Sequence, residues 1–364
     1  MRKILFKQIS SVSLAILLTI SGFGNAQQVS AKTLKTASFA YFDVGQGNSA
    51  LIKSGSSSVL IDTGKKSEYS TLQRQLRQLN TSKIDTLVIS HPDSDHMESA
   101  DQIISSYHVK KIIFPKISAT TQCYKKMIAA VRRYNLKTVH PVSGQKMKLA
   151  PSCSATILSV DASSNDKNEA SIVMRVTYGS RSFLYMGDAT ARVESNILSK
   201  GNKIASDVYL MSHHGSDTAN GALFVKKALS SKYKNAVISV GAGNSYGHPV
   251  KSVVRRAYRY ARAVYRTDKK GMILYKTNGS NLKVSFKKIT HQTSSYSTHT
   301  TARRSTKTHS TSKNSSSSSK EWVYVTNSGK KYHNAGCRYL ASSSIKIKLN
   351  NAKSQGYTPC SICH

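Results

Sequence analysis

An α/β fold is predicted for residues 36–290, because short apolar runs typical of strands alternate there with longer helical patterns. The chain has 364 residues, which leaves room for a second, smaller domain. Strand-like runs cover residues 37–42, 58–62, 87–90, 111–114, 171–176, 183–186, 208–211 and 236–240. Helical patterns cover residues 68–79, 121–134, 190–199, 220–230 and 250–265.

One six-residue loop carries four side chains that bind divalent metals. His91, Asp93, Asp95 and His96 directly follow the strand-like run 84–90. Mixed nitrogen and oxygen ligands suit zinc or manganese better than calcium. A single His-x-Asp pair would be more typical of a solvated turn, but four potential ligands in six residues favour a metal site.

Polar motifs also stand beside other strand-like runs of the domain, where loops gather at one edge of a sheet. They are DVGQGN from Asp43, LIDTG over residues 60–64, the stretch 168–171, Gly187-Asp188, SHHGS over residues 212–216 and YGHP over residues 246–249. We expect acidic and imidazole groups from four separate strand ends to converge there in one site.

In this order and spacing, the motifs resemble those of the metallo-β-lactamase superfamily, and most closely those of ComEC-type DNA-processing competence proteins and their secreted relatives. The resemblance covers about residues 36–285. It implies an αββα metallo-β-lactamase sandwich with two divalent metal ions, zinc or manganese, in the groove between the sheets.

The resemblance also implies five metal-ligand positions. They are His91 and Asp93 for one ion, Asp95 and His96 for the other, and Asp188 as a bridge between both. Two departures matter. Asp93 stands where the superfamily usually has a histidine, and the stretch 168–171 stands where it has its third histidine ligand. The first site is therefore oxygen-rich, which favours manganese more than a two-zinc lactamase site would.

One imidazole of the His213–His214 pair is implied to complete the second site. His214 is favoured because it directly precedes a glycine, as the ligand does in related loops, and His213 would then face the substrate phosphate. His248 is a further phosphate contact or a proton donor. The implied chemistry has two metals clamping a phosphodiester oxygen and activating a water, which Asp95 orients.

The charge of the chain indicates a polyanionic partner. It contains 54 Lys and Arg against 17 Asp and Glu, a formal net charge of +37. Such a charge attracts DNA or another nucleic acid, an anionic cell-wall polymer or a membrane surface, and a general solubility adaptation is the alternative.

A basic row near the end of the domain is predicted to bind nucleic-acid phosphates. Its residues are spaced four, three and four apart, so in a helix they would all lie on one face: Arg255, Arg259, Arg262 and Arg266. The adjoining stripe, expected to face the core, consists of Val254, Tyr258, Ala261 and Tyr265. A row of arginines without acidic partners fits a phosphate track, although a solvated helix face would also be basic.

Residues 1–31 have the features of a secretory signal peptide. A basic start at Arg2, Lys3 and Lys7 precedes a short apolar core over residues 12–20, and small residues follow it as cleavage candidates. The apolar run is too short to predict a spanning helix. We therefore expect a secreted or cell-surface protein without an integral membrane span once the signal is removed.

The end of the chain is predicted to hold a separate zinc-binding module. Residues 291–320 form a Ser/Thr-rich basic tract without apolar periodicity, which predicts a disordered linker. In residues 321–364 the pattern His333-x3-Cys337 and Cys360-x2-Cys363 predicts one structural zinc ion. The module resembles the small Ada-type metal-binding domain. A Cys360–Cys363 disulfide is the alternative, because export permits oxidation.

Charge and motifs together predict an exported metal-dependent hydrolase, a phosphodiesterase or nuclease that acts on DNA. Two alternatives stay open: a phosphocholine, teichoic-acid or other ester hydrolase of the same fold, and a non-catalytic DNA-binding protein of the cell surface. The charge favours a polyanionic substrate over a lactam or thioester.

Overall fold

The structure, a computed structural model, describes residues 34–289 and 291, and then 322–326, 329–334, 337–340, 345–360 and 363. The predicted signal peptide and, apart from His291, the predicted linker lie outside the described residues. Residues 34–289 are called the sandwich domain below, and the described residues from Trp322 onward the C-terminal module. No helix in the described part of the chain is long and apolar enough to cross a membrane.

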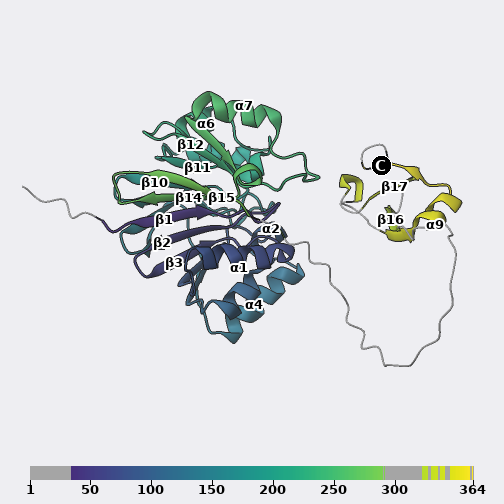
Figure 1. Ribbon diagram of the computed structural model, residues 1–364, viewed down its shortest axis with the longest axis horizontal. Coiled ribbons are helices and arrows are strands. Elements are labelled where there is room, and N and C mark those ends of the chain that lie inside the picture. Colours follow the sequence, from purple (N-terminus) through teal and green to yellow (C-terminus); the bar gives the residue numbers. More distant parts are fainter. Residues whose placement is uncertain are drawn as a thin grey trace, which may run out of the picture. The chain divides into compact units, whose positions relative to one another are not determined.

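The sandwich domain contains two mixed sheets (Figure 1). The first has the strand order β15-β14-β1-β2-β3-β4-β5-β6. Its strands are β1 (Ala37–Tyr41), β2 (Ala50–Ser54), β3 (Ser57–Ile61), β4 (Thr86–Val88), β5 (Lys111–Ile113), β6 (Lys137–Val139), β14 (Met272–Thr277) and β15 (Lys283–Lys287). The strands β3 to β6 pair in parallel, so their carboxyl ends lie at one edge.

The second sheet has the order β13-β12-β11-β10-β9-β8-β7. Its strands are β7 (Lys146–Ala150), β8 (Cys153–Ser159), β9 (Val173–Tyr178), β10 (Arg181–Tyr185), β11 (Val208–Leu210), β12 (Asn235–Ile238) and β13 (Ala263–Arg266). Here β10 to β13 pair in parallel. Each sheet thus carries one parallel half, and loops that leave its carboxyl ends can share a groove.

The core lies in three layers. Between the sheets, Phe39 stacks on Phe183 with ring centroids 3.6 Å apart, and both side chains are fully buried. A second cluster packs the first sheet against α1 (Tyr69–Gln78), α3 (Ala100–Ser106) and α4 (Gln122–Arg133). A third packs the second sheet against α5 (Ala191–Ser199), α6 (Ala222–Ala228) and α7 (Lys251–Tyr260). The αββα sandwich expected from the sequence is confirmed.

Short elements complete the domain and carry site residues. They are α2 (Ser94–Met97), α8 (Thr267–Lys270) and the 3₁₀ turns η1 (Lys66–Glu68) and η2 (Ser212–Gly215). The strand-like runs expected from the sequence correspond to β1, β3, β4, β5, β9, β10, β11 and β12. The hairpins β7–β8 and β14–β15 were not among the expected strands.

The prediction of four arginines on one helical face is wrong. The helix α7 ends at Tyr260, and the chain then extends into β13, which pairs in parallel with β12. Only Arg255 and Arg259 lie on α7, while Arg266 belongs to the strand. Sheet pairing overrides the helical spacing here, because the segment Ala263–Arg266 pairs with β12 and extends the second sheet as its edge strand. The expected core stripe is right only in part: Val254 and Ala261 pack against the core, but Tyr258 is 62% exposed, and the fully buried residues of α7 are Val253 and Ala257.

The C-terminal module is built from small elements. Its pieces are β16 (Trp322–Val325), antiparallel to β18 (Ile345–Lys348), β17 (Lys331–Tyr332), parallel to β19 (Thr358–Pro359), the 3₁₀ turn η3 (Arg338–Leu340) and α9 (Leu349–Ser354). The buried apolar residues of its core are Val323, Val325, Tyr332 and Ala352. This core is too small to stabilise a domain without a further link.

Candidate metal centre

The loops after the parallel strands bring the polar motifs together at one edge of the sandwich. In the first sheet, β3 and β4 end shortly before Asp62 and Ser90, and in the second, β10 ends shortly before Asp188. Four side chains offer ligand atoms that all lie within 4.8 Å of one another: Asp95, His96, Asp188 and His214. Both sheets therefore contribute to one cluster.

His96 is fully buried and is held in one orientation by Asp62. Its Nδ1 lies 2.8 Å from Oδ2 of Asp62, and the backbone N–H of Ser90 donates to the other carboxylate oxygen at 2.7 Å. With Nδ1 engaged, Nε2 of His96 faces Oδ1 of Asp188 at 3.1 Å. An imidazole whose Nδ1–H is fixed by a carboxylate presents Nε2 to a metal ion.

His214 is oriented in the same way from the opposite sheet. Its Nδ1 lies 2.9 Å from the carbonyl oxygen of Ser239, just after β12. Its Nε2 lies 3.1 Å from Oδ2 of Asp95 and 3.6 Å from Oδ2 of Asp188. Asp188 thus stands between the Nε2 atoms of two imidazoles, each of which has its Nδ1 anchored elsewhere.

Several buried atoms in and beside the cluster make no hydrogen bond within the described residues. They are Nε2 of His91, and Nε2 of His96 and Oδ1 of Asp188, which lie 3.1 Å apart but without hydrogen-bond geometry. Buried polar atoms in folded proteins are almost always satisfied, so these three indicate a missing partner. A divalent cation fits, because the atoms are imidazole nitrogens and a carboxylate oxygen turned toward one another.

His91 and Asp93 form a looser pair outside the four-group cluster. Nε2 of His91 lies 3.7 Å from Oδ2 of Asp93, while Nδ1 of His91 lies 3.1 Å from the hydroxyl of Ser90. The Asp93 side chain is 38% exposed, and the ammonium of Lys167 lies 3.3 Å from its Oδ1. The residues expected to bind a first metal are thus beside the cluster, but a lysine engages one of them.

His213 and His248 lie beside the cluster at its open side. Nε2 of His213 lies 3.6 Å from Oδ2 of Asp188, and its Nδ1 lies 3.1 Å from the hydroxyl of Thr218. The rings of His213 and His248 are 5.6 Å apart, and His248 is only half-buried. Both imidazoles are therefore accessible to a molecule that enters the site.

Burial and neighbouring charges perturb the titration of the cluster. Burial lowers the pKa of His96, but the carboxylates of Asp188 and Asp62 outweigh it and hold the pKa well above its usual range. Burial raises the pKa of Asp188, but the imidazoles of His96 and His214 outweigh it and hold the pKa well below its usual range. Burial, with the nearby His96, lowers the pKa of His91 to about 4. A metal ion would take the place of the His96 proton, so binding would release it.

Two glycines allow the loops to approach closely. A Cβ on Gly47 would lie 2.5 Å from the backbone oxygen of Asp95, whose carbonyl accepts the N–H of Asn48 at 3.0 Å. Gly187 has a φ of +56°, and a Cβ there would lie 2.9 Å from the hydroxyl of Ser171, which accepts the N–H of Asp188. Gly47 of DVGQGN and Gly187 therefore leave the space that lets Asp95 and Asp188 take their positions in the cluster.

Not every motif reaches the cluster. Oδ2 of Asp43 lies 3.0 Å from Nε2 of His291, and Glu169 forms an ion pair with Arg192, so these two acids are not part of the cluster. Conversely, Asp62 was not among the expected site residues. The sequence signal for it is the acid at the end of a strand-like run in LIDTG, directly after β3; Asp188 likewise follows β10, three residues after its end.

The C-terminal module contains a second group of potential ligands. His333, Cys337, Cys360 and Cys363 offer ligand atoms that all lie within 4.8 Å of one another. Nδ1 of His333 is 3.2 Å from Sγ of Cys337, and the N–H of Asn334 donates to Sγ of Cys363 at 3.3 Å. None of these three cysteines forms a disulfide bond, so the alternative Cys360–Cys363 disulfide is not formed in this structure.

The thiols of this group are crowded. Burial and the adjacent thiols of Cys337 and Cys360 raise the pKa of Cys363 to about 11. Crowded, protonated thiols next to an imidazole are a donor set that a zinc ion would deprotonate and hold together.

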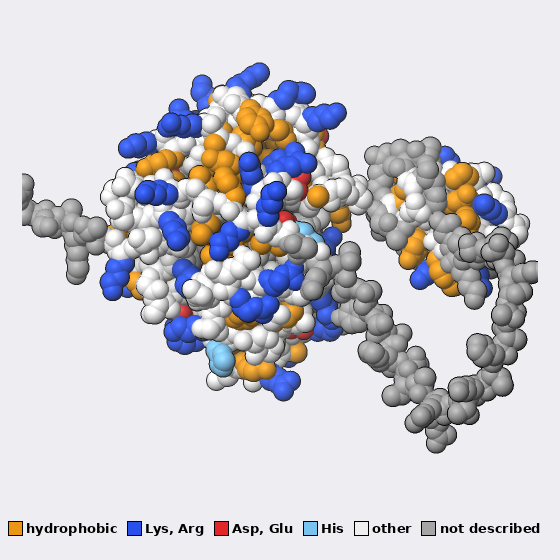
Figure 2. Space-filling model, viewed as in Figure 1, with side chains coloured by type: hydrophobic (Ala, Val, Ile, Leu, Met, Phe, Trp, Pro, Cys, Tyr) orange, Lys and Arg blue, Asp and Glu red, His pale blue; other side chains and the backbone are white. Residues whose placement is uncertain are grey.

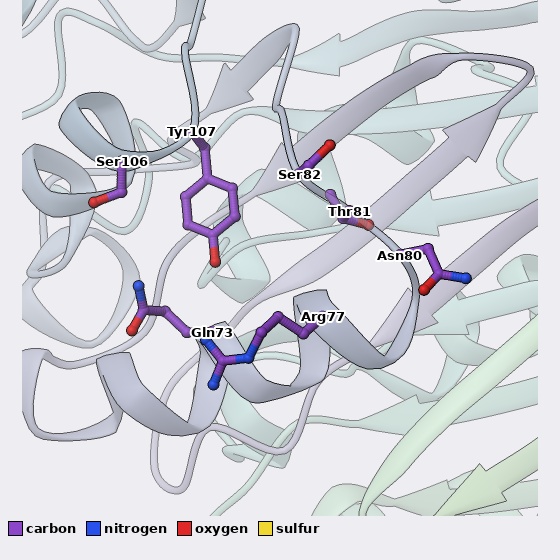
Figure 3. Close-up of a pocket in the computed structure, with 7 residues that line it drawn as sticks. All are labelled: Gln73, Arg77, Asn80, Thr81, Ser82, Ser106 and Tyr107. Atoms are coloured by element: carbon purple, nitrogen blue, oxygen red, sulfur yellow. The ribbon is translucent and has the colours of Figure 1, made fainter.

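A surface pocket of about 350 Å³ lies elsewhere in the sandwich domain (Figure 3). It is lined by Gln73, Arg77, Asn80, Thr81, Ser82, Ser106 and Tyr107, from α1 and from the end of α3. The lining contains no carboxylate or imidazole. It is therefore not the place of the hydrolytic chemistry expected from the sequence.

A comparison with protein families identifies the fold family. The profile described as the metallo-beta-lactamase superfamily matches residues 42–229, just over half of the 364 residues. The chain belongs to the metallo-β-lactamase superfamily. Its αββα sandwich and the His/Asp cluster at the sheet edge agree with that membership, and the fold is that of metal-dependent hydrolases.

Three similar proteins are named for competence or recombination. The chain is 28% identical over 253 residues to ComE operon protein 3 of Bacillus subtilis, which covers 64% of this chain and 32% of that protein. It is 29% identical over 242 residues to competence protein ComA of Neisseria gonorrhoeae, with coverage of 66% and 32%. It is 28% identical over 235 residues to recombination protein 2 of Haemophilus influenzae, with coverage of 64% and 28%. The chain spans about a third of the length of these relatives.

Solved structures with a related fold are more distant in sequence. The metallo-beta-lactamase fold protein YhfI from Bacillus subtilis has a TM-score of 0.48 at 14% identity, with 67% of this chain and 100% of that chain covered. The metallo hydrolase Igni18 from Ignicoccus hospitalis has a TM-score of 0.44 at 15% identity, with coverage of 66% and 98%.

Proposed function

We propose that the sandwich domain is a metal-dependent phosphodiesterase that acts on nucleic acid, most directly on DNA. The observation that carries the proposal is the cluster of Asp95, His96, Asp188 and His214. Both imidazoles have their Nδ1 fixed by a protein acceptor and their Nε2 directed at the shared carboxylate of Asp188. This arrangement is preformed for a divalent ion, zinc or manganese.

A dinuclear centre follows if His91 and Asp93 hold a second ion, with Asp188 as the bridge. The buried Nε2 of His91 has no hydrogen bond in the described part of the chain, which favours a ligand role. Asp93 supplies its carboxylate only if Lys167 moves away or keeps one of the two oxygens. The second position is therefore the weaker of the two, and its carboxylate suits manganese.

The residues around the cluster define the steps that the protein itself performs. A bound divalent ion supplies Lewis acidity, which polarises a phosphoryl oxygen and lowers the pKa of water. Asp95 accepts a hydrogen bond from the attacking water and orients it. His213 faces the phosphate, with its Nδ1 beside the hydroxyl of Thr218. His248, half-buried at the open side, contacts the phosphate or protonates the leaving oxygen.

The charge supports a polyanionic substrate. The net charge is +37, and Figure 2 shows Lys and Arg side chains spread over the visible face of the sandwich domain with few acidic ones between them. Arg255 and Arg259 on α7 stay as proposed phosphate contacts, together with Arg262 in the turn that follows. Arg266 is a weaker candidate, because its guanidinium lies 2.6 Å from Oδ2 of Asp268. The competence relatives also favour DNA.

Two further parts of the proposal concern the ends of the chain. We infer that residues 1–31 direct export, which would place the protein outside the cell or on its surface, where an anionic wall polymer is a further partner. We also infer that His333, Cys337, Cys360 and Cys363 bind one structural zinc ion. The mutual approach of their four ligand atoms supports this inference.

The test is a turnover assay of the purified full-length protein. Single- and double-stranded DNA, RNA and a phosphocholine ester are each incubated with Mn²⁺, Mg²⁺ or Zn²⁺, with a chelator as control. We expect metal-dependent cleavage of at least one nucleic acid. Turnover of the phosphocholine ester alone would establish the ester-hydrolase alternative. DNA binding without any turnover, with metal bound, would establish the non-catalytic alternative.

A further inference from the structure

The loop after β12 exposes an aromatic side chain beside the candidate metal centre. Tyr246 is 61% exposed, although tyrosine buries readily and the rest of the loop is well ordered by hydrogen bonds. A large exposed aromatic side chain at the mouth of a site is a candidate for ligand contact.

Asn244 holds this loop in one conformation. Its Nδ2 donates to the carbonyl oxygens of Gly241 at 3.0 Å and His248 at 2.6 Å. Its Oδ1 accepts the backbone N–H groups of Tyr246 and His248, both at 3.1 Å. The N–H of Gly241 in turn donates to the side chain of Gln46 at 3.1 Å, which ties the loop to DVGQGN. Tyr246 is therefore displayed by a rigid frame, so little entropy is lost when it contacts a ligand.

A row of roughly parallel rings leads from Tyr246 to the cluster. The ring of Tyr246 lies 6.1 Å from that of His248 with an interplanar angle of 26°. The ring of His248 lies 6.4 Å from that of His214 with an angle of 24°. His214 is one of the four residues of the cluster. A flat group on Tyr246 would thus have the same orientation as the rings that lead into the site.

A cation stands beside the exposed ring. The ammonium of Lys65 is 5.5 Å from the centroid of Tyr246, and it forms no ion pair with any acid among the described residues. Lys65 follows Asp62 on the loop after β3, so it comes from the opposite sheet. An aromatic face with an uncommitted ammonium next to it provides stacking for a base and a charge for its phosphate.

We propose that Tyr246 stacks on an unpaired nucleobase and that Lys65 binds the adjoining phosphate, so that the enzyme takes single-stranded nucleic acid. This inference rests on the proposed phosphodiesterase function and names the substrate class of the same site. Bases inside a duplex already stack on one another, and their faces are not offered to a side chain unless the strand opens. A single strand offers every base face, and stacking tolerates any sequence.

The test compares a single-stranded oligonucleotide with the same strand carrying abasic residues in place of nucleotides. In the full-length protein, Tyr246→Leu is expected to raise KM on the base-bearing strand about 5- to 100-fold, the range for loss of one stacked base, and to leave KM on the abasic strand unchanged. Tyr246→Trp should restore the preference for bases. A matched control is Tyr134→Leu, because Tyr134 is 44% exposed and has the guanidinium of Arg133 5.7 Å from its ring, but it directly follows the end of α4.

Binding is measured in parallel by fluorescence anisotropy with Asp188→Asn, so that stacking is tested whether or not any strand is cleaved. Tighter binding of the base-bearing strand that Tyr246→Leu abolishes supports the inference, even if the wild-type protein cleaves nothing and the proposed hydrolysis fails. Equal affinity for both strands, equal losses on both strands, or a preference for duplex DNA would overturn it.

Discussion

The sandwich domain and the C-terminal module each gather four potential metal ligands, but they do so on very different supports. In the sandwich domain, three hydrophobic clusters hold the strands whose ends carry Asp95, His96, Asp188 and His214. In the C-terminal module, the hydrophobic cluster that supports His333 and three cysteines has only four buried apolar residues. In the first case the fold places the ligands, and in the second the ligands must help to hold the fold.

The chemistry of the two sets differs accordingly. Imidazoles and carboxylates, with ligand groups partly open to solvent, leave space for a substrate and suit a catalytic ion. Three thiolates and one imidazole form a closed tetrahedral set of the kind that structural zinc uses. Removal of metal should therefore have opposite consequences: loss of activity with the fold retained in one region, and loss of the fold in the other.

The largest expected effect is unfolding of the C-terminal module on metal removal. Structural zinc in small modules contributes roughly 10–16 kcal/mol, far more than this small core can replace. Trp322 is the only tryptophan of the chain and starts β16, so its fluorescence reports on this module alone. Chelation under reducing conditions should shift the Trp322 emission to the red, and equimolar Zn²⁺ should reverse the shift. Far-ultraviolet circular dichroism should show that most of the β structure of the full chain persists.

Unchanged Trp322 emission and unchanged protease resistance after complete metal removal would show that the C-terminal module folds without metal. The proposed difference between the two regions would then be wrong. Cys360→Ser provides an independent check, because Cys360 is buried and the variant should stay unfolded even with zinc present.

The next largest effect is loss of hydrolysis in Asp188→Asn. Asp188 lies between the Nε2 atoms of His96 and His214, and its replacement removes the charge shared by both imidazoles. We expect kcat/KM to fall by more than the roughly 10- to 100-fold that loss of an outer hydrogen-bond partner costs. Circular dichroism should be unchanged, because the three hydrophobic clusters do not depend on this side chain. Activity within a few-fold of the wild type would show that Asp188 does not bridge metal ions.

A smaller effect is expected for Asp62→Asn, which acts through His96. The Asp62 carboxylate orients Nδ1 of His96 at 2.8 Å and makes no closer approach to the cluster. Metal affinity should fall by roughly 10- to 100-fold, with kcat largely recovered at saturating metal, because the ligand itself remains. Isothermal titration with Mn²⁺ measures the affinity. Asp161→Asn, a surface carboxylate paired with Arg192, is the matched control and should bind metal like the wild type.

Asp62 also shows what could and could not be predicted from the sequence. The αββα fold follows from the alternation of strand-like and helical runs, and polar motifs beside these runs predict one site at a sheet edge, because parallel strands bring their carboxyl ends together. The individual residues of the four-group cluster were implied by the resemblance to metallo-β-lactamase motifs. The partners that fix Nδ1 of the histidines, Asp62 and the Ser239 carbonyl, come from distant segments. A carbonyl leaves no sequence signal at all, and an acid after a strand has many alternative uses, as Asp43 shows with His291.

The arginine row failed for a different reason. Spacings of four and three residues satisfy a helix, but the same segment also contains the short apolar run Ala263-Val264-Tyr265, which a strand accepts equally well. The open edge of β12 decides between them, because β13 completes the second sheet there. Such competition depends on a neighbour that is more than twenty residues away in the sequence, so local periodicity cannot resolve it.

The smallest expected effect is a pH dependence of stability that belongs to the sandwich domain alone. Glu194 in α5 accepts the N–H groups of Asn220 at 2.7 Å and Gly221 at 2.8 Å, and thus holds the segment that follows the His213–His214 pair. Burial raises the pKa of Glu194 to about 7, although these hydrogen bonds act in the opposite direction.

A carboxyl whose pKa is raised in the folded state contributes stability that is fully present below its unfolded pKa and is lost as the pH rises through the folded pKa. The free energy of unfolding of the wild type should therefore fall relative to that of Glu194→Gln by on the order of 1–2 kcal/mol between pH 5.5 and 7. Urea denaturation of both metal-free proteins, followed by circular dichroism, measures this difference, and the histidines that titrate in both proteins cancel. A difference that stays constant across this pH range would show that Glu194 does not change its protonation state there, and would contradict the raised pKa.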